Sequence, residues 1–132
     1  LEKNHFRIIS SAAVRTHDKA HILKHLSKDI EFKDVTDELI CLGVFGPKSR
    51  ELLSEITNED LSNENFKFGT SKNIKLGSIN VWAQRLSYVG ELGYELYIDQ
   101  DKGKEIYEEG KIALDNAGIT IPFPQVDVHM SK

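Results

Sequence analysis

Residues 85–98 read RLSYVGELGYELYI, and this stretch decides the fold that the sequence predicts. Tyr94, Leu96 and Ile98 alternate with other residues, a period of two that is typical of a strand with one buried face. Gly90 and Gly93 lie just before this strand, and glycines at this spacing allow a sharp turn between two extended runs. The stretch therefore predicts a strand that follows a tight turn.

Runs rich in β-branched or large apolar residues predict further strands upstream. They cover residues 5–11, 30–35 and 40–45, with a long strand or bent hairpin arm at 74–88. Because the run from Ile40 to Phe45 is almost wholly apolar, its strand is predicted to be buried on both faces. Residues 57–73 are polar and rich in Asn and Ser, so they predict a long loop.

The spacing of apolar residues also predicts three helices. They cover residues 16–26, 47–56 and 101–117. Thr16 is expected to cap the first, Pro47 to open the second and Gly118 to end the third. The helices are predicted to contribute to the core Leu23, Leu52, Ile56 and Ile106. These elements predict an α+β fold with helices on one side of a mainly antiparallel sheet.

Composition restricts the class of protein further. The chain has 132 residues, 39% of them hydrophobic, which suits one domain with a single core. With 17 basic and 21 acidic residues the net charge is -4, so neither nucleic acid nor an anionic membrane is an expected partner. No apolar stretch approaches the roughly 20 residues that span a bilayer. The chain begins at Leu1 rather than at a methionine, and we expect it to be a piece of a longer protein.

Cys41 is the single cysteine, which excludes a disulfide framework within the chain and fits a reduced compartment. Its apolar neighbours predict a packed core residue rather than a nucleophile. His17, His21 and His25 lie four residues apart on one predicted helix face. His17 and His25 would be about 12 Å apart along the axis, too far to share one metal ion, so no metal site is predicted.

Glu95 is the strongest candidate for a binding residue. A carboxylate on a rigid strand can accept two hydrogen bonds from a planar group that presents a ring N–H beside an amino group, such as a pterin. Tyr88 could stack on such a ring. The plainer alternative is that the Gly90–Gly93 segment is just a hairpin turn.

Three segments carry a resemblance to a known family. The stretch RLSYVGELGYELYI resembles the signature of the glycine-cleavage T protein family, and LGVFGPKSRELL with DLSNENFKFGTSKNI resembles the segment that precedes it there. The opening HFRIISSAAVRTHDKAHILKHL is similar to the multidomain dimethylglycine and sarcosine dehydrogenases. The resemblance covers residues 4–98, most of the chain.

The resemblance implies a fold and a site. Residues 1–118 would be part of an aminomethyltransferase folate-binding domain, namely its middle, ferredoxin-like subdomain. Glu95 matches the family glutamate that holds the pterin ring of tetrahydrofolate, and Tyr88 matches a tyrosine near the folate. Gly90, Glu91 and Gly93 match the family turn.

The resemblance also implies a function. The chain would be a fragment of a tetrahydrofolate-dependent one-carbon transfer domain from a dimethylglycine or sarcosine dehydrogenase-like demethylase. Its partners would be folate and an amine substrate whose identity stays open, with FAD bound only in a parent domain outside this chain. The family's acidic catalytic residue would lie upstream of Leu1, so no catalytic residue is assigned here and the isolated fragment is expected to be inactive. The setting would be cytoplasmic, or the mitochondrial matrix in a eukaryote.

An alternative stays open: a non-catalytic α+β module or fusion relic that binds no folate. Residues 113–130, ALDNAGITIPFPQVDVHM, resemble the closing segment of small-conductance mechanosensitive channels. Residues 119–132 are therefore set apart as a tail whose origin stays open between a fused reading frame and a chance similarity. No membrane partner is expected despite this tail.

Overall fold

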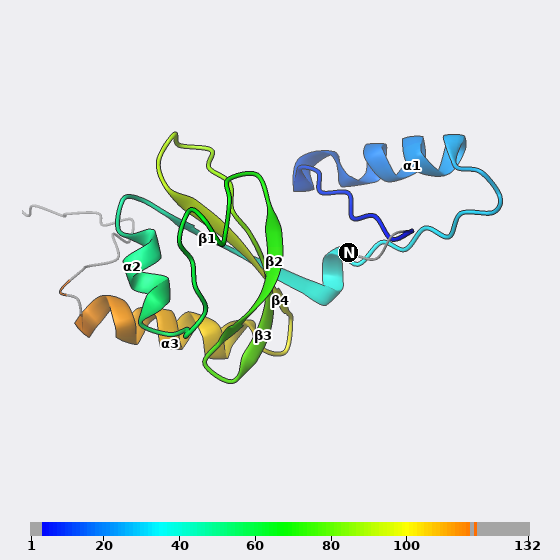
Figure 1. The fold of residues 1–132 in the computed structure, drawn as a ribbon. Helices are drawn as coiled ribbons and strands as arrows, with labels where there is room; N and C mark the ends of the chain where they lie inside the picture. Colours follow the sequence, from blue (N-terminus) through cyan, green and yellow to red (C-terminus); the bar gives the residue numbers. More distant parts are fainter. Residues whose placement is uncertain (1–3, 117, 119–132) are drawn as a thin grey trace, which may run out of the picture. The chain divides into compact units, whose positions relative to one another are not determined.

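The computed structural model describes residues 4–116 and residue 118 (Figure 1). The chain divides into two compact units at Val35, and each is described by itself. The tail at residues 119–132 and the predicted helix residue Ala117 lie outside the described residues.

The first unit is built around helix α1 (Arg15–His25), which follows a 3₁₀ turn, η1 (Ala12–Val14). Asp34 accepts a hydrogen bond from Arg15 Nε and another from Lys19 Nζ, both at 3.2 Å. Arg15 and Lys19 of the helix thus bind the segment around Asp34.

The predicted helix at residues 16–26 is confirmed to within one residue, but three other predictions for this unit are wrong. The N-cap is Val14 rather than Thr16, which lies inside the helix, and no side chain caps this end. Residues 5–11 and 30–35 form no strand, because β-rich composition yields a strand only where a partner supplies the ladder of hydrogen bonds. Leu23 is 51% exposed and is not a core residue. The less exposed side of α1 carries Ile22 instead, since helical periodicity alone does not say which side of a polar helix is covered.

The second unit contains a four-stranded sheet with the order β1-β4-β3-β2, in which all neighbours are antiparallel. Its strands are β1 (Leu39–Phe45), β2 (Ser71–Leu76), β3 (Ile79–Gln84) and β4 (Gly93–Asp99). A short 3₁₀ turn, η2 (Thr36–Glu38), precedes β1. The strands predicted at 40–45 and 94–98 are confirmed, and the 74–88 segment forms a hairpin that turns at Gly77, with φ +52°. The predicted burial of the 40–45 strand on both faces is wrong, because the helices cover one side of the sheet and residues 41, 43 and 45 are exposed on the other.

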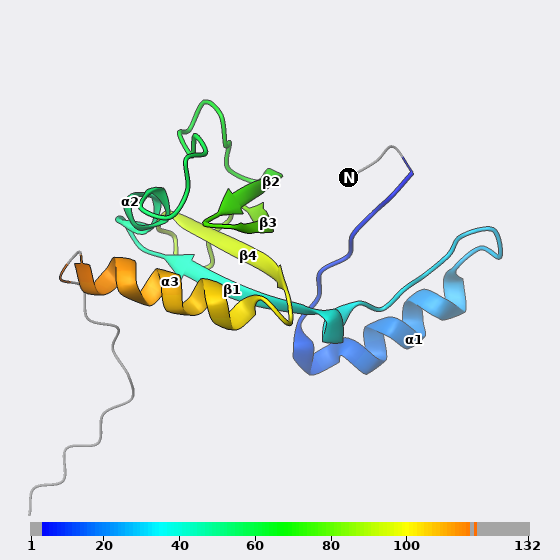
Figure 2. The ribbon, with the colours of Figure 1, turned by 90° about the horizontal axis from the view of Figure 1, so that it is seen from below.

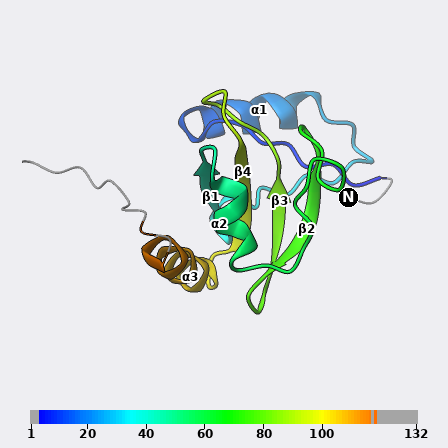
Figure 3. The same cartoon turned by 60° about the vertical axis from the view of Figure 1, so that its left-hand side comes forward.

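Two helices, α2 (Ser49–Ser54) and α3 (Gly103–Asn116), pack against one face of this sheet (Figures 2 and 3). Leu53 of α2 and Ile106 of α3 belong to one buried cluster with the inward side chains of the strands. Gly118 has φ +67° and its N–H bonds the Asp115 carbonyl at 3.1 Å, so its predicted role as helix stop is confirmed. The members of the cluster from the sheet and loop are Leu61, Phe66, Ile74, Leu76, Ile79, Val81, Ala83, Tyr94, Leu96 and Ile98.

The predicted core is right in part. Ile106 is buried, and Leu52 and Ile56 are half-buried, the latter beyond the end of α2. The helix begins at Ser49 rather than at Pro47, and the Ser49 hydroxyl donates to the Leu92 carbonyl at 3.3 Å. The start of α2 is therefore set by a contact with the segment before β4.

The α+β class and the antiparallel sheet are confirmed, but the ferredoxin-like alternation is not found in the described residues. A ferredoxin-like unit runs strand, helix, strand, strand, helix, strand. Here β2, β3 and β4 follow one another without a helix, and α3 comes after β4. The difference arises because β4 follows β3 without an intervening helix and pairs with it antiparallel, so the second helix comes after the last strand.

Candidate functional site

The sheet has a second side, turned away from the core, which we call the outer face. Alternation along the strands places on it Cys41, Gly43 and Phe45 of β1, Trp82 and Gln84 of β3, and Glu95 and Tyr97 of β4. The register sets these residues side by side in rows, because Glu95 pairs with both Gly43 and Gln84. Tyr97 likewise pairs with Cys41 and Trp82.

Glu95 places a carboxylate in the middle of this face, and it is only 8% exposed. The Tyr97 hydroxyl donates a hydrogen bond of 2.5 Å to Glu95 Oε2, which holds the carboxylate in one orientation on the strand. The Tyr97 ring lies 4.9 Å from the Trp82 ring between centroids, tilted by 51°. The arrangement is a fixed anionic acceptor beside an aromatic pair.

The surroundings of Glu95 also affect the ionisation of Tyr97 and Cys41. Burial, followed by the hydrogen bond to Glu95, raises the pKa of the Tyr97 hydroxyl well above its usual range, so Tyr97 remains a proton donor. Partial desolvation of the thiol on the outer face, followed by the nearby Glu95 charge, also raises the pKa of Cys41. Cys41 is exposed, so its predicted place in the core is wrong, because the inward positions of β1 belong to its neighbours such as Leu42. A raised pKa disfavours a reactive thiolate at this site.

Gly43 and Gly93 give the outer face room for an aromatic ring. A Cβ atom at Gly43 would lie 2.5 Å from Phe45 Cε2, and one at Gly93 would meet the same ring and lie 2.6 Å from the Leu86 carbonyl oxygen. Tyr88 contacts Phe45 edge to face, with centroids 6.4 Å apart at 72°. Tyr88 is thereby connected through Phe45 to the row that holds Glu95.

The predicted site residues separate into two groups. Glu95 and Gly93 lie on β4, whereas Tyr88, Gly90 and Glu91 lie on the exposed loop that precedes it. Gly90 has φ +77° with open space around it, so this position needs glycine for its backbone conformation. Gly93 has no such φ and needs glycine because other atoms lie too close.

Sequence reasoning missed four residues of the outer face. They are Phe45, Trp82, Gln84 and Tyr97. Period-two alternation would have put Tyr97 on the same side as Glu95, but the other three can be assigned only from the strand register.

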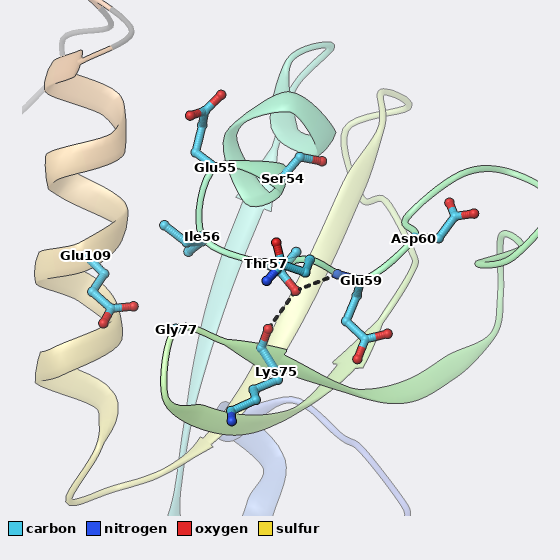
Figure 4. A pocket seen from close by; sticks show the side chains of 10 residues that line it. Ser54, Glu55, Ile56, Thr57, Glu59, Asp60, Lys75, Gly77 and Glu109 are labelled. Atoms are coloured by element: carbon cyan, nitrogen blue, oxygen red, sulfur yellow. Dashed lines mark hydrogen bonds between the residues drawn. The ribbon is translucent and has the colours of Figure 1, made fainter.

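A cavity of about 650 Å³ lies elsewhere in the second unit, between the end of α2, β2 and α3 (Figure 4). Thr57 Oγ1 donates to the Lys75 carbonyl at 2.6 Å on its wall. None of the predicted site residues lines the cavity. Its lining carries four carboxylates, from Glu55, Glu59, Asp60 and Glu109, against one lysine. This balance disfavours an anionic ligand.

The α1 histidines do not converge on one point. The rings of His21 and His25 have centroids 4.7 Å apart, while His17 Nδ1 lies 3.4 Å from Asp18 Oδ1. Among the residues that the structure describes, no group of three His, Cys, Asp or Glu side chains is placed to hold a metal ion.

We expect this histidine face to bind zinc with a dissociation constant above the micromolar range, because a helical i, i+4 pair offers two ligands where stable zinc sites use three or four. Isothermal titration with zinc chloride measures it. Sub-micromolar binding that disappears in His21→Ala would contradict the expectation.

In the described part of the chain no helix has both the length and the apolar character needed to cross a membrane. Fold and outer face together define an α+β module with one helix-covered side and one side that carries a carboxylate among aromatic rings. The chain belongs to the GCVT N-terminal domain family, a family of folate-binding domains, whose model matches residues 1–120. The resemblance to the glycine-cleavage T family is thereby confirmed.

Curated relatives agree with this assignment. The chain is 41% identical over 116 residues to human mitochondrial dimethylglycine dehydrogenase, an alignment that covers 86% of this chain and 13% of that protein. It is 34% identical over 126 residues to human mitochondrial sarcosine dehydrogenase, covering 89% of this chain and 14% of that protein. A 4-methylaminobutanoate oxidase (formaldehyde-forming) from Paenarthrobacter nicotinovorans is 41% identical over 75 residues, with 57% and 9% covered. The chain spans about one seventh of the two dehydrogenases.

Proposed function

We propose that this chain supplies the pterin-holding part of a tetrahydrofolate-binding domain. The observation that carries the proposal is the Glu95 carboxylate, fixed on β4 by the Tyr97 hydroxyl, whose ring in turn lies against Trp82. A buried carboxylate in a set orientation accepts well from the ring N–H and the amino group of a pterin. Aromatic rings beside it favour a planar ligand.

The hydrogen-bond acceptors of the Glu95 carboxylate also suit the donor edge of a folate pterin. No lysine or arginine of the described residues forms an ion pair with Glu95, so its acceptor capacity is not used by a cation. When bound, tetrahydrofolate supplies N5 and N10 as acceptors for a one-carbon unit. The residues of this chain would bind and orient the ring, and none of them is assigned a catalytic role.

The larger protein, on this proposal, is a demethylase of the dimethylglycine or sarcosine dehydrogenase kind. A flavin domain outside this chain would oxidise the N-methyl amine, and the folate domain would capture the released carbon. The family match and the two dehydrogenase relatives support this reading. A cytoplasmic or mitochondrial-matrix setting is part of the same proposal.

The test is an NMR titration of the ¹⁵N-labelled chain with 5-formyltetrahydrofolate, a stable reduced folate. We expect weak binding by the chain by itself, with a dissociation constant on the order of a millimolar. Shifts should concentrate at Glu95, Tyr97 and the Trp82 indole N–H, while Thr57 and Lys75 at the acidic cavity stay unmoved. Unchanged spectra, or shifts confined to the cavity, would favour a module that binds no folate at Glu95.

A further inference from the structure

We propose that Gln84 is a second recognition residue of the outer face, whose side-chain amide accepts a hydrogen bond from the amino group of the planar ring held by Glu95. This inference rests on the proposed function and deepens it. It assigns a role in ligand selection to a residue that the sequence pattern does not single out.

The first argument is placement. Gln84 and Glu95 are direct partners across β3 and β4, so both side chains project from the same side of the sheet. The Cβ atoms of such partners lie about 4.5–5.5 Å apart. One planar ligand can therefore contact the amide and the carboxylate together.

The second argument is an acceptor without a donor. Gln84 Oε1 is buried and has no hydrogen-bond partner among the described residues. Buried polar atoms in proteins are nearly always hydrogen-bonded, because an unmet buried acceptor loses its bonds to water without replacement. No side chain or backbone group of the described residues uses this acceptor beside the fixed carboxylate, so it is available to a donor from a ligand.

The third argument compares the hydrogen-bond donors of a pterin edge with the acceptors of Glu95 and Gln84. A pterin edge presents one ring N–H and an amino group with two N–H bonds. The Tyr97 hydroxyl already occupies part of the capacity of Glu95 Oε2. Glu95 can take the ring N–H and the nearer amino hydrogen, which leaves the farther amino hydrogen for Gln84 Oε1.

The segment that carries Gln84 is firmly held, so the unmet atom does not result from a loosely packed loop. The backbone N–H of Arg85 bonds the Thr70 carbonyl at 2.9 Å, and the Arg85 carbonyl accepts from the Gly69 N–H at 2.8 Å. Arg85 Nη1 also donates to the Phe66 carbonyl at 2.5 Å. Ser87 Oγ, a few residues on, is likewise buried without a hydrogen bond. This anchored segment leads directly to Tyr88.

The experiment compares Gln84→Leu with Gln100→Leu, a matched change at an exposed glutamine. Removing an unmet buried acceptor should raise the melting temperature of the ligand-free chain by roughly 2 to 5 °C, measured by circular dichroism. The same change should raise the dissociation constant for 5-formyltetrahydrofolate roughly 3- to 10-fold in the NMR titration. Gln100→Leu should alter neither value.

The outcomes separate the inference from the proposed function. If the wild-type chain binds folate at Glu95 and Gln84→Leu binds equally well, the role of Gln84 is wrong while the proposed function stands. If the wild-type chain shows no shifts at Glu95, both are wrong. If both Gln84→Leu and Gln84→Met lower the melting temperature or fail to fold, the amide is structural, which also overturns the inference.

Discussion

Replacing Glu95 by glutamine is expected to weaken tetrahydrofolate binding by about ten- to a hundredfold, which corresponds to about 1.5 to 3 kcal/mol. The substitution keeps the shape of the side chain and still offers an oxygen to the Tyr97 hydroxyl. It replaces the other acceptor by an N–H₂ donor that faces the donors of the pterin, and it removes the negative charge. The loss therefore arises in recognition rather than in folding.

The measurement is isothermal titration of a chimera in which this chain replaces the matching segment of human dimethylglycine dehydrogenase. Glu91→Gln is the control, because Glu91 is exposed on the loop before β4 and the same chemical change there should cost far less. Equal affinities for Glu95→Gln and the unsubstituted chimera would remove the main support for folate recognition at this residue.

Gly93→Ala is expected to lower the free energy of unfolding by about 2 to 3 kcal/mol, as inserting a methyl group into a filled space does. The added Cβ would meet the Phe45 ring and lie 2.6 Å from the Leu86 carbonyl oxygen. The ring can turn aside, but the backbone oxygen cannot move without shifting the segment before β4. Urea unfolding followed by tryptophan fluorescence measures the change.

Gly90 differs from Gly93, because glycine is needed at position 90 for its backbone conformation and not because other atoms lie close. Asparagine tolerates the left-handed region, so Gly90→Asn should cost well under 1 kcal/mol. Gly93→Asn should cost at least as much as Gly93→Ala. A tolerant Gly93 beside an intolerant Gly90 would reverse the roles assigned to the two glycines.

The local sequence pattern was sufficient to predict most helices and strands of the second unit. The alternation of Tyr94, Leu96 and Ile98 predicts β4, and their exposures of 0, 2 and 0% confirm the buried side. Helix α3 was predicted from its apolar spacing and from Gly118. These features depend on residues close together in the chain, which is why the sequence reveals them.

Features that depend on distant pairing were not predictable in the same way. The strand-like composition of residues 5–11 misleads, because the structure gives this segment no partner strand among the described residues. Leu61 and Phe66 belong to the core although the segment around them is polar, since a long loop folds back over the sheet. The placement of Gln84 beside Glu95 depends on register, which a single sequence does not specify.

Strand β4 has a consequence for how this family can evolve. Its odd-numbered residues lie on the outer face and its even-numbered residues build the interior, with Glu95 between Tyr94 and Leu96. Inserting or deleting one residue within the strand would exchange the two sets, so that the packing of the interior and the arrangement of the outer face would be lost at once. Natural variation in β4 should therefore proceed by substitution, with length changes confined to the loop around Gly90. Single exchanges can change the chemistry of the outer face, while the other side keeps the domain folded.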